Sequence, residues 1–173
     1  CKADIAILNG TMTVYEIKSE RDSLSRLHRQ IEDYCDVFAS VYVVAAENHV
    51  DAVLKETPSE VGVLSLNHRY SITPQRHARD MPSRTSPRTV VDARRTNEVE
   101  AILTMLGVPV PAVPNTQRRA VLSQAFAKLR PEDVHVSMLD TLKRTRNMAP
   151  LASLVSQLPK SLQPAALLIP HEK

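Results

Sequence analysis

The sequence has no tryptophan, and aromatic residues make up only 3% of its 173 positions. Hydrophobic residues nevertheless account for 43% of the chain. The core must therefore be built mainly from the aliphatic side chains of Val, Leu, Ile and Ala. A chain of this length can bury one such core, with room for a small second module.

Cysteine is also scarce, because Cys1 and Cys35 are the only two and lie far apart. This spacing indicates neither a disulfide framework nor a cysteine metal site, and it favours a reducing cytoplasm. The six histidines are scattered without paired ligand spacing, which favours structural roles for them.

Long hydrophobic runs are absent as well. No apolar stretch approaches the roughly 18 residues of a membrane-spanning helix, and no signal-peptide pattern opens the chain. We therefore expect a soluble, cytoplasmic protein without a membrane partner. The chain starts with Cys1 directly in strand-like sequence, so we expect the natural protein to extend further upstream.

The chain divides by pattern into three parts. Residues 1–70 alternate strand-like and helix-like runs, which predicts an α/β core. Residues 71–96 are rich in Arg, Pro and Ser and are predicted to be a basic linker or loop, whereas residues 97–173 are predicted to be helical. The predicted strands are 3–8, 12–18, 41–46 and 61–66, and the predicted helices are 23–36, 49–56, 98–106, 116–129, 131–146 and 151–158.

The Asn9-Gly10 pair between the first two strand-like runs predicts an antiparallel hairpin. Glu16 shares a strand face with Lys18, because side chains alternate along a strand. A strict two-residue turn would direct Asp4 to the opposite face. A three-residue connection over 9–11, or a bulge, would instead place Asp4 directly opposite Glu16, and our interpretation requires that irregularity.

Charged groups on apolar strands are costly unless they are paired or bind a metal ion. Asp4 and Glu16 would supply hard oxygen ligands for Mg²⁺ or Mn²⁺, together with the backbone carbonyl of Ile17. Lys18 could orient or deprotonate an attacking water, or stabilise charge that develops on a phosphate. These groups together predict a site for phosphodiester hydrolysis. The alternative is that Glu16 and Lys18 form a solvent-facing pair, and that Asp4 caps a strand.

The predicted helix 23–36 adds polar residues that could overlook this site. Arg26, Gln30 and Tyr34 are spaced four apart and therefore align along one edge of the helix. Gln30 could bind a water or a phosphate, and Arg26 or Tyr34 could contact a nucleic-acid strand. Taken alone, Gln30 and Tyr34 fit ordinary helix-surface residues better than functional ones.

Asp4, followed after eleven residues by Glu16-Ile17-Lys18 and then by a helix with Gln30-x-x-x-Tyr34, resembles the PD-(D/E)XK nuclease superfamily. The last pair is similar to its RecB-type branch. A bacterial and phage group within the superfamily is resembled by three runs, Tyr15-Glu16-Ile17-Lys18-Ser19, Asp22-x-Leu24-x-Arg26-Leu27 and Gln30 through Tyr34. The resemblance covers about the first 66 residues.

The resemblance implies a restriction-endonuclease-like αβββαβ core, here without the helix and strand that usually precede the aspartate. It also implies that Asp4, Glu16 and Lys18 are catalytic and that Gln30 and Tyr34 support them. Mg²⁺ would be the cofactor, with Mn²⁺ as a substitute.

Positive charge is concentrated in the proline- and arginine-rich segment. It contains six arginines and two acidic residues, Asp80 and Asp92, so its net charge is +4. The net charge of the whole chain is +3, so the remaining residues together carry −1. Such a segment could neutralise DNA phosphates without reading sequence, or it could be a solvated linker. The arginines are Arg76, Arg79, Arg84, Arg88, Arg94 and Arg95, and Arg26 is a further candidate for nucleic-acid contact.

The sequence therefore predicts an Mg²⁺-dependent DNA nuclease with a helical C-terminal extension. One alternative is a catalytically inactive, nuclease-like DNA-binding or interaction module in a defence, repair or phage system. Another is a small regulatory or structural protein. In either case the helical region could mediate a homodimer or bind a protein partner.

Overall fold

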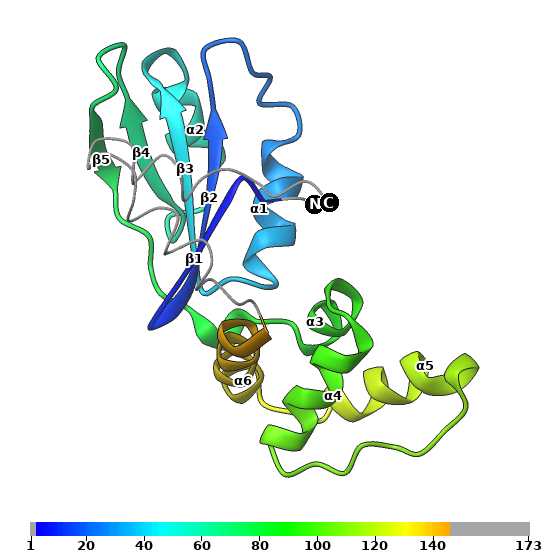
Figure 1. The fold of residues 1–173 in the computed structure, drawn as a ribbon. Coiled ribbons are helices and arrows are strands. Elements are labelled where there is room, and N and C mark those ends of the chain that lie inside the picture. Colours follow the sequence, from blue (N-terminus) through cyan, green and yellow to red (C-terminus); the bar gives the residue numbers. More distant parts are fainter. Residues whose placement is uncertain (1–2, 146–173) are drawn as a thin grey trace, which may run out of the picture.

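The computed structural model of the chain describes residues 3–145 (Figure 1). The predicted α/β class is confirmed: a five-stranded mixed sheet with flanking helices is followed by a helical region. The elements are β1 (Ile5–Asn9), β2 (Thr11–Lys18), α1 (Leu27–Cys35), β3 (Ser40–Ala46), η1 (Glu47–His49), α2 (Val50–Glu56), β4 (Gly62–Leu66), β5 (Ile72–Arg76), η2 (Pro82–Arg84), α3 (Pro87–Ala93), α4 (Thr96–Met105), α5 (Asn115–Phe126) and α6 (Pro131–Thr145).

The five strands lie side by side in the order in which they occur in the chain. β2, β3 and β4 are parallel, whereas β1 and β5 pair antiparallel with their neighbours at the two edges. α1 connects β2 to β3, and α2 connects β3 to β4, as parallel pairs require a crossover. The C-terminal ends of the three parallel strands therefore lie side by side at one end of the strands.

The hairpin between β1 and β2 has an irregular connection of the kind that the nuclease interpretation requires. Leu8 pairs with Met12 and Asn9 with Thr11 on either side of Gly10, which has a φ of +70° that glycine adopts without strain. Ile5 pairs with Tyr15 in the same register. Continuing this register by one residue places Asp4 opposite Glu16, as predicted.

One face of the sheet is covered by α1 and α2. Val14 of β2 is buried in a cluster with Leu27 and Ile31 of α1 and Val53 of α2. The same cluster contains alternate residues of β3 and β4, all of them aliphatic. Burial of this aliphatic face fixes α1 against β2, and it thereby fixes the positions of Gln30 and Tyr34 on that helix.

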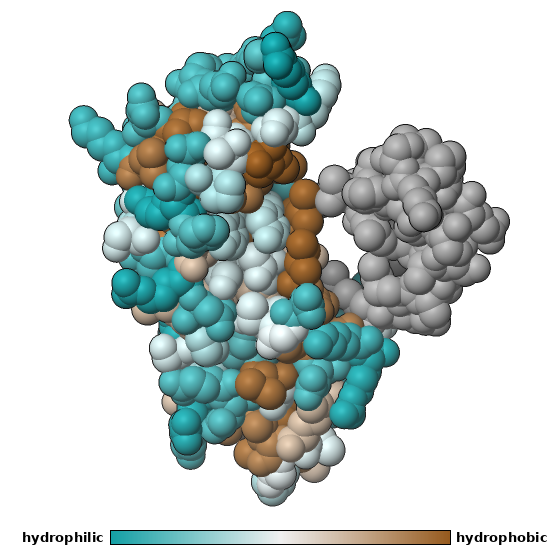
Figure 2. All heavy atoms as spheres, turned by 90° about the vertical axis from the view of Figure 1, so that its left-hand side faces the viewer, coloured by the Kyte–Doolittle hydropathy of each residue, from teal (hydrophilic) through white to brown (hydrophobic). Residues whose placement is uncertain are grey.

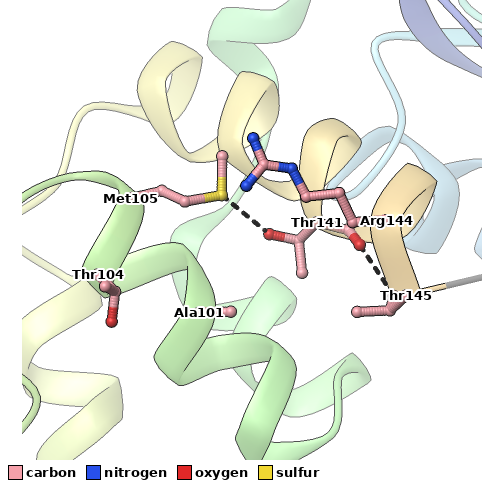
Figure 3. Close-up of a pocket in the computed structure, with 6 residues that line it drawn as sticks. All are labelled: Ala101, Thr104, Met105, Thr141, Arg144 and Thr145. Atoms are coloured by element: carbon pink, nitrogen blue, oxygen red, sulfur yellow. Dashed lines mark hydrogen bonds between the residues drawn. The ribbon is translucent and has the colours of Figure 1, made fainter.

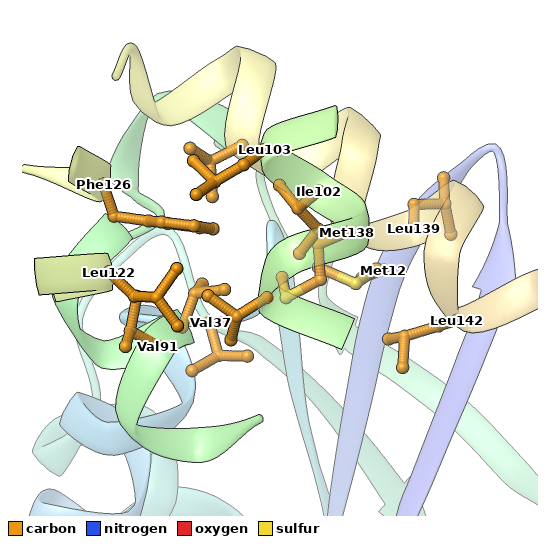
Figure 4. Packing of buried hydrophobic residues seen from close by; sticks show 13 residues of the cluster. Met12, Val37, Val91, Ile102, Leu103, Leu122, Phe126, Met138, Leu139 and Leu142 are labelled. Atoms are coloured by element: carbon orange, nitrogen blue, oxygen red, sulfur yellow. The ribbon is translucent and has the colours of Figure 1, made fainter. Parts of the chain in front are cut away.

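A second core joins the helical region to the sheet (Figure 4). Phe126 of α5 and Met138 of α6 are fully buried in it, together with residues of α3 and α4. Met12 of β2 and Val37, which follows α1, belong to the same cluster. The helices therefore share a core with the end of the sheet instead of lying apart from it.

The segment 71–96 is not the linker or loop that its composition predicts. It contains β5, a 3₁₀ turn and α3, and α4 begins at its end. Val90 and Val91 of α3 are fully buried in the second core. Tertiary packing of these two valines orders a segment whose average composition is polar.

A buried histidine ties α6 to the hairpin. His135 is 2% exposed, with Nδ1 3.0 Å from the Thr85 hydroxyl and Nε2 3.4 Å from that of Thr11. Thr11 in turn donates to Asp80, as does Ser40, so Thr11 must accept from Nε2–H. Burial lowers the pKa of His135, against a smaller opposing effect of Asp80, and this favours the neutral ring that the network requires.

Within residues 3–145, no helix is both long and apolar enough to cross a membrane. The predicted helix 151–158 lies outside the described residues. The other predicted helices and strands are present, with boundaries that differ by up to four residues.

Candidate active site

Two charged side chains of β2 are buried beneath α1. Glu16 is 3% exposed and Lys18 is 5% exposed, on the same face as Val14. The Lys18 Nζ donates to Glu16 Oε1 at 2.9 Å and to Gln30 Oε1 at 2.8 Å. The alternative interpretation of Glu16 and Lys18 as a solvent-facing pair is therefore wrong.

α1 supplies the remaining partners of the Glu16 carboxylate. Gln30 Nε2 donates to Oε1 at 2.5 Å, and the Tyr34 hydroxyl donates to Oε2 at 2.6 Å. These two residues are one turn apart and border the apolar stripe that holds α1 on the sheet. The predicted residues Glu16, Lys18, Gln30 and Tyr34 are therefore brought together, and we call them the Glu16 cluster.

The Tyr34 hydroxyl is held in its protonated form. Burial raises its pKa above the ordinary value, and the hydrogen bond to Glu16 and the charges of Glu16 and Asp4 raise it further. Tyr34 therefore acts as a permanent donor to Glu16 at neutral pH. The contribution of Asp4 also indicates that its carboxylate lies near this end of the cluster.

Asp4 is exposed and lies just before β1. Its Oδ2 accepts a hydrogen bond of 2.9 Å from the backbone N–H of Ile17, a donor that lies beyond the reach of the β1 ladder. The N–H and C=O of a strand residue point to the same side, so the Ile17 carbonyl is expected to face the side on which Asp4 lies. The contact between Asp4 and the Ile17 N–H was not predicted from the sequence.

The carboxylates of Asp4 and Glu16 offer hard oxygen atoms, the kind of donor that Mg²⁺ takes. Among residues 3–145 there is no group of three His, Cys, Asp or Glu side chains that could enclose a metal ion. Mg²⁺ does not need one, because it is commonly held by one or two carboxylates, with water and substrate phosphate completing its shell. Asp4, Glu16 and the Ile17 carbonyl supply this kind of oxygen set.

The turn after β2 is fixed by a residue whose role the sequence interpretation missed. Asp22 Oδ2 accepts from the backbone N–H of Ser19 at 2.7 Å and from its hydroxyl at 2.6 Å. The Ser19 hydroxyl, followed by its backbone N–H, lowers the pKa of Asp22. The Ser-x-x-Asp spacing was the available signal, because short side chains of this type commonly close turns.

Three of the predicted nucleic-acid-binding arginines are half-buried in the fold. Arg76 donates to the backbone carbonyl of Val61 at 2.7 Å and to the Thr57 hydroxyl at 2.5 Å. Nη1 of Arg84 lies 3.4 Å from the Glu60 carboxylate. Arg94 directly follows the last residue of α3. Arg76 and Arg84 hold the segment 71–96 against the sheet, so their prediction as DNA contacts is not supported by their surroundings.

The other predicted arginines, Arg26, Arg79, Arg88 and Arg95, are exposed. Arg26 lies at the N-terminal boundary of α1, and Arg79 lies between β5 and the 3₁₀ turn. Arg88 lies on α3, and Arg95 precedes α4. Charge is divided unevenly between the two parts. Residues 3–73 carry six basic and eleven acidic side chains, a net charge of −5, whereas residues 74–145 carry twelve and seven, a net charge of +5.

A pocket lies between α4 and α6, away from the Glu16 cluster (Figure 3). Met105 lies on one side of it and accepts a hydrogen bond from Thr141 across the pocket, and Arg144 is its one charged lining residue. None of its lining residues belongs to the Glu16 cluster. The pocket therefore adds nothing to the candidate active site.

Comparison with known proteins identifies the family. The family model described as "Bacteriophage P4 protein cII" matches residues 1–165. The chain belongs to this family. Protein cII of Enterobacteria phage P4 is 39% identical over 70 residues, which are 40% of this chain and 26% of that relative. The chain therefore spans about a quarter of the length of this P4 cII relative. No solved structure matches the chain.

Proposed function

We propose that this member of the P4 cII family is an Mg²⁺-dependent DNA nuclease that hydrolyses phosphodiester bonds. The observation that carries the proposal is the buried Glu16 carboxylate, which accepts from Lys18, Gln30 and Tyr34 while Asp4 lies across the hairpin. Burying a glutamate and a lysine is costly, and a fold that only needed stability would be better served by apolar residues here.

The order of elements also supports the proposal. β1, β2, α1 and β3 follow one another as an antiparallel hairpin, a helix and a parallel strand. This is the order of the last four elements of the αβββαβ core that the resemblance implies. The acidic residues lie on the two hairpin strands, and the Gln30 and Tyr34 pair lies on the helix that follows them.

Each residue has a distinct role in the proposed reaction. Asp4, Glu16 and the Ile17 carbonyl would hold the cation, which when bound supplies positive charge to the phosphate. Lys18 has a third N–H that neither Glu16 nor Gln30 takes, and this donor would orient a water or stabilise the developing negative charge. Gln30 and Tyr34 fix the Glu16 carboxylate in one orientation.

A calorimetric titration with Mn²⁺ tests the metal site directly. We expect Asp4→Asn to weaken binding by at least about tenfold, because it removes one of two negative ligands, whereas Asp51→Asn on the exposed surface of α2 should leave binding unchanged. Equal Mn²⁺ affinity of the wild type and Asp4→Asn would contradict the assignment of Asp4.

A second candidate function is a catalytically inactive, nuclease-like module that binds DNA. Two observations favour it: both oxygens of Glu16 already accept hydrogen bonds, and the positive charge is concentrated in residues 74–145. In this case DNA affinity would persist without cleavage, and it would not depend on the metal.

A triple variant in which Ser replaces Arg79, Arg88 and Arg95 tests whether these three exposed arginines contact DNA. We expect affinity to fall for every DNA sequence and the salt dependence of affinity to become shallower, by up to about one unit of slope per lost phosphate contact. The measurement is fluorescence anisotropy with labelled DNA across a salt series.

The matched control replaces three other exposed residues, Lys55, Arg69 and Arg130, with Ser. This control removes the same amount of positive charge. If the control variant changes the slope as much as the first variant does, the first set of arginines makes no specific contribution to DNA contact.

A further inference from the structure

Most polar side chains of residues 3–145 lie at the surface, and hydrophilic residues cover much of the side on which β5 lies (Figure 2). The hydrogen-bonded group around His135 is an exception. His135 is 2% exposed and Thr85 is 1% exposed, although a histidine ring takes up a proton near neutral pH. We call His135, Thr85, Thr11 and Asp80 the His135 network.

The His135 network joins parts of the chain that are distant in sequence. His135 lies on α6, Thr11 is the first residue of β2, and Thr85 directly follows η2. Asp80 accepts from the Thr11 hydroxyl at 2.8 Å and from the Ser40 hydroxyl at 3.0 Å. Figure 1 shows α6 beside the end of the sheet at which the β1–β2 turn lies. The network therefore connects α6 to this end of the sheet.

The hydrogen bonds of the network fit only a neutral ring. The Thr11 hydroxyl gives its hydrogen to Asp80, so it accepts from the Nε2–H of His135 at 3.4 Å. In the neutral ring Nδ1 then carries no hydrogen, and it accepts from the Thr85 hydroxyl at 3.0 Å. Each hydrogen in the chain of contacts thus has one acceptor.

A second proton on the ring breaks this arrangement. It turns Nδ1 from an acceptor into a donor, so the Thr85 hydroxyl must direct its hydrogen elsewhere. Within residues 3–145 that hydroxyl has no second hydrogen-bond partner. Burial lowers the pKa of His135, and the opposing effect of the Asp80 charge is smaller. Acid therefore works against the contacts that hold α6 to Thr85 and Thr11.

The charged side chains of the described elements that pack on α6 are engaged with other partners. The partners are Glu60 for Arg84 of η2, the backbone N–H of Arg95 for Glu98 of α4, Arg118 for Glu100 of α4, and each other for Glu16 and Lys18 of β2. On the side of α6 itself, Arg130 lies beside Glu132 and Asp133. Asp80 is the charged group that acts on the His135 ring.

We propose that protonation of His135 releases α6 from Thr85 and from the β1–β2 turn, so that acid loosens the helical region while α1 and α2 stay packed on the sheet. The core under α1 and α2 has no buried member beyond Val63, so it does not depend on α6. The proposal is independent of the nuclease activity, because none of its groups belongs to the Glu16 cluster.

The sign of the pH dependence follows from the burial of the ring. A released ring has the ordinary histidine pKa of 6.5, whereas the buried ring has a lower pKa. The released state therefore takes up protons first as the pH falls below that value. The contacts of α6 are complete above it and are lost progressively below it.

Nuclear magnetic resonance of isoleucine methyl groups follows the two cores separately in the unaltered chain. Ile102 is fully buried in the second core, and Ile31 is 2% exposed in the core under α1 and α2. We expect the Ile102 signal to shift or broaden between about pH 8 and 5, together with the ring signal of His135, while the Ile31 signal stays unchanged. Signals of Ile102 and Ile31 that change together at one pH would indicate global unfolding and overturn the proposal.

Two variants test the role of His135. His135→Gln keeps a donor and an acceptor on a side chain that takes up no proton, so the Ile102 signal should lose its pH dependence. Asp80→Asn keeps the acceptor oxygen but removes the charge that favours the protonated ring, so the transitions of His135 and Ile102 should both move to lower pH. The matched control is Asp92→Asn on the exposed surface of α3, which should leave both transitions in place.

The same variants can contradict the proposal. An Ile102 transition that persists in His135→Gln would assign the pH dependence to another group. Asp80→Asn retains His135 and changes an exposed residue, so it decides the question even if His135→Gln does not fold. An Ile102 transition that stays in place in Asp80→Asn while the His135 transition moves would overturn the proposal.

Discussion

Glu16→Gln is expected to abolish Mg²⁺-dependent DNA cleavage, with a loss of at least about 10²- to 10³-fold in rate. The change removes the negative charge that would hold the cation. It also leaves one acceptor oxygen where Lys18, Gln30 and Tyr34 now direct three donors. The measurement is the rate at which linear, circular and single-stranded DNA are cut in Mg²⁺ and in Mn²⁺.

Glu20→Gln is the matched control, because Glu20 is exposed and lies two residues beyond the end of β2. It should cut all three DNA forms at the wild-type rate. Lys18→Ala should be as inactive as Glu16→Gln. Cleavage by Glu16→Gln and Lys18→Ala at the wild-type rate would refute the assignment of the active site. A wild type that binds DNA without cutting it would favour the inactive module.

Phe126→Ala is expected to lower the free energy of unfolding by about 3–5 kcal/mol. Phe126 is fully buried in the core that α3 to α6 share with Met12 of β2 (Figure 4). Removing its ring leaves a cavity lined by aliphatic side chains that cannot collapse without moving whole helices. The measurement is urea unfolding followed by circular dichroism.

Phe38→Ala provides the comparison, because the chain contains only two phenylalanines and Phe38 is half-buried between the two cores. Its loss should be clearly smaller than that of Phe126→Ala. If Phe126→Ala costs less than Phe38→Ala, Phe126 does not lie at the centre of the helical core.

The elements predicted correctly are those whose residues alternate or recur strongly. β2 reads as a strand because every second residue is apolar up to Val14, and α6 begins at Pro131, which suits the first turn of a helix. Counting showed that the nuclease interpretation requires either a longer connection or a bulge in the hairpin, because a shift of one residue reverses every side chain, and the pairing register meets that requirement.

β5 and α3 were missed for physical reasons. Pro74 argues against a strand in sequence, yet an edge strand such as β5 tolerates it. α3 has only two buried valines in seven residues, and its start depends on Ser86, which accepts from the backbone N–H of Thr89. Their stability comes from partners distant in sequence, which local patterns do not contain.

Composition alone also failed to distinguish arginines that are hydrogen-bonded within the fold from arginines that are exposed to solvent. Arg76 and Arg79 are three residues apart, but the first is held by backbone carbonyls and the second is exposed. The site was more predictable, because the E-x-K and Q-x-x-x-Y spacings place all four members of the Glu16 cluster on adjoining faces. The contact of Asp4 with the Ile17 N–H depends on where β1 begins, and no motif encodes that point.

The length of the β1–β2 connection decides on which face of the sheet Asp4 and the side chains of β1 lie. Because Glu16 is fixed by partners on α1, a relative that lost or gained one residue at the turn could keep the sheet, the helix and the buried carboxylate intact. Its aspartate would nevertheless be rotated to the far side. Among natural variants of this family, the count of residues between these two acids should therefore diverge first wherever selection for the proposed reaction has lapsed.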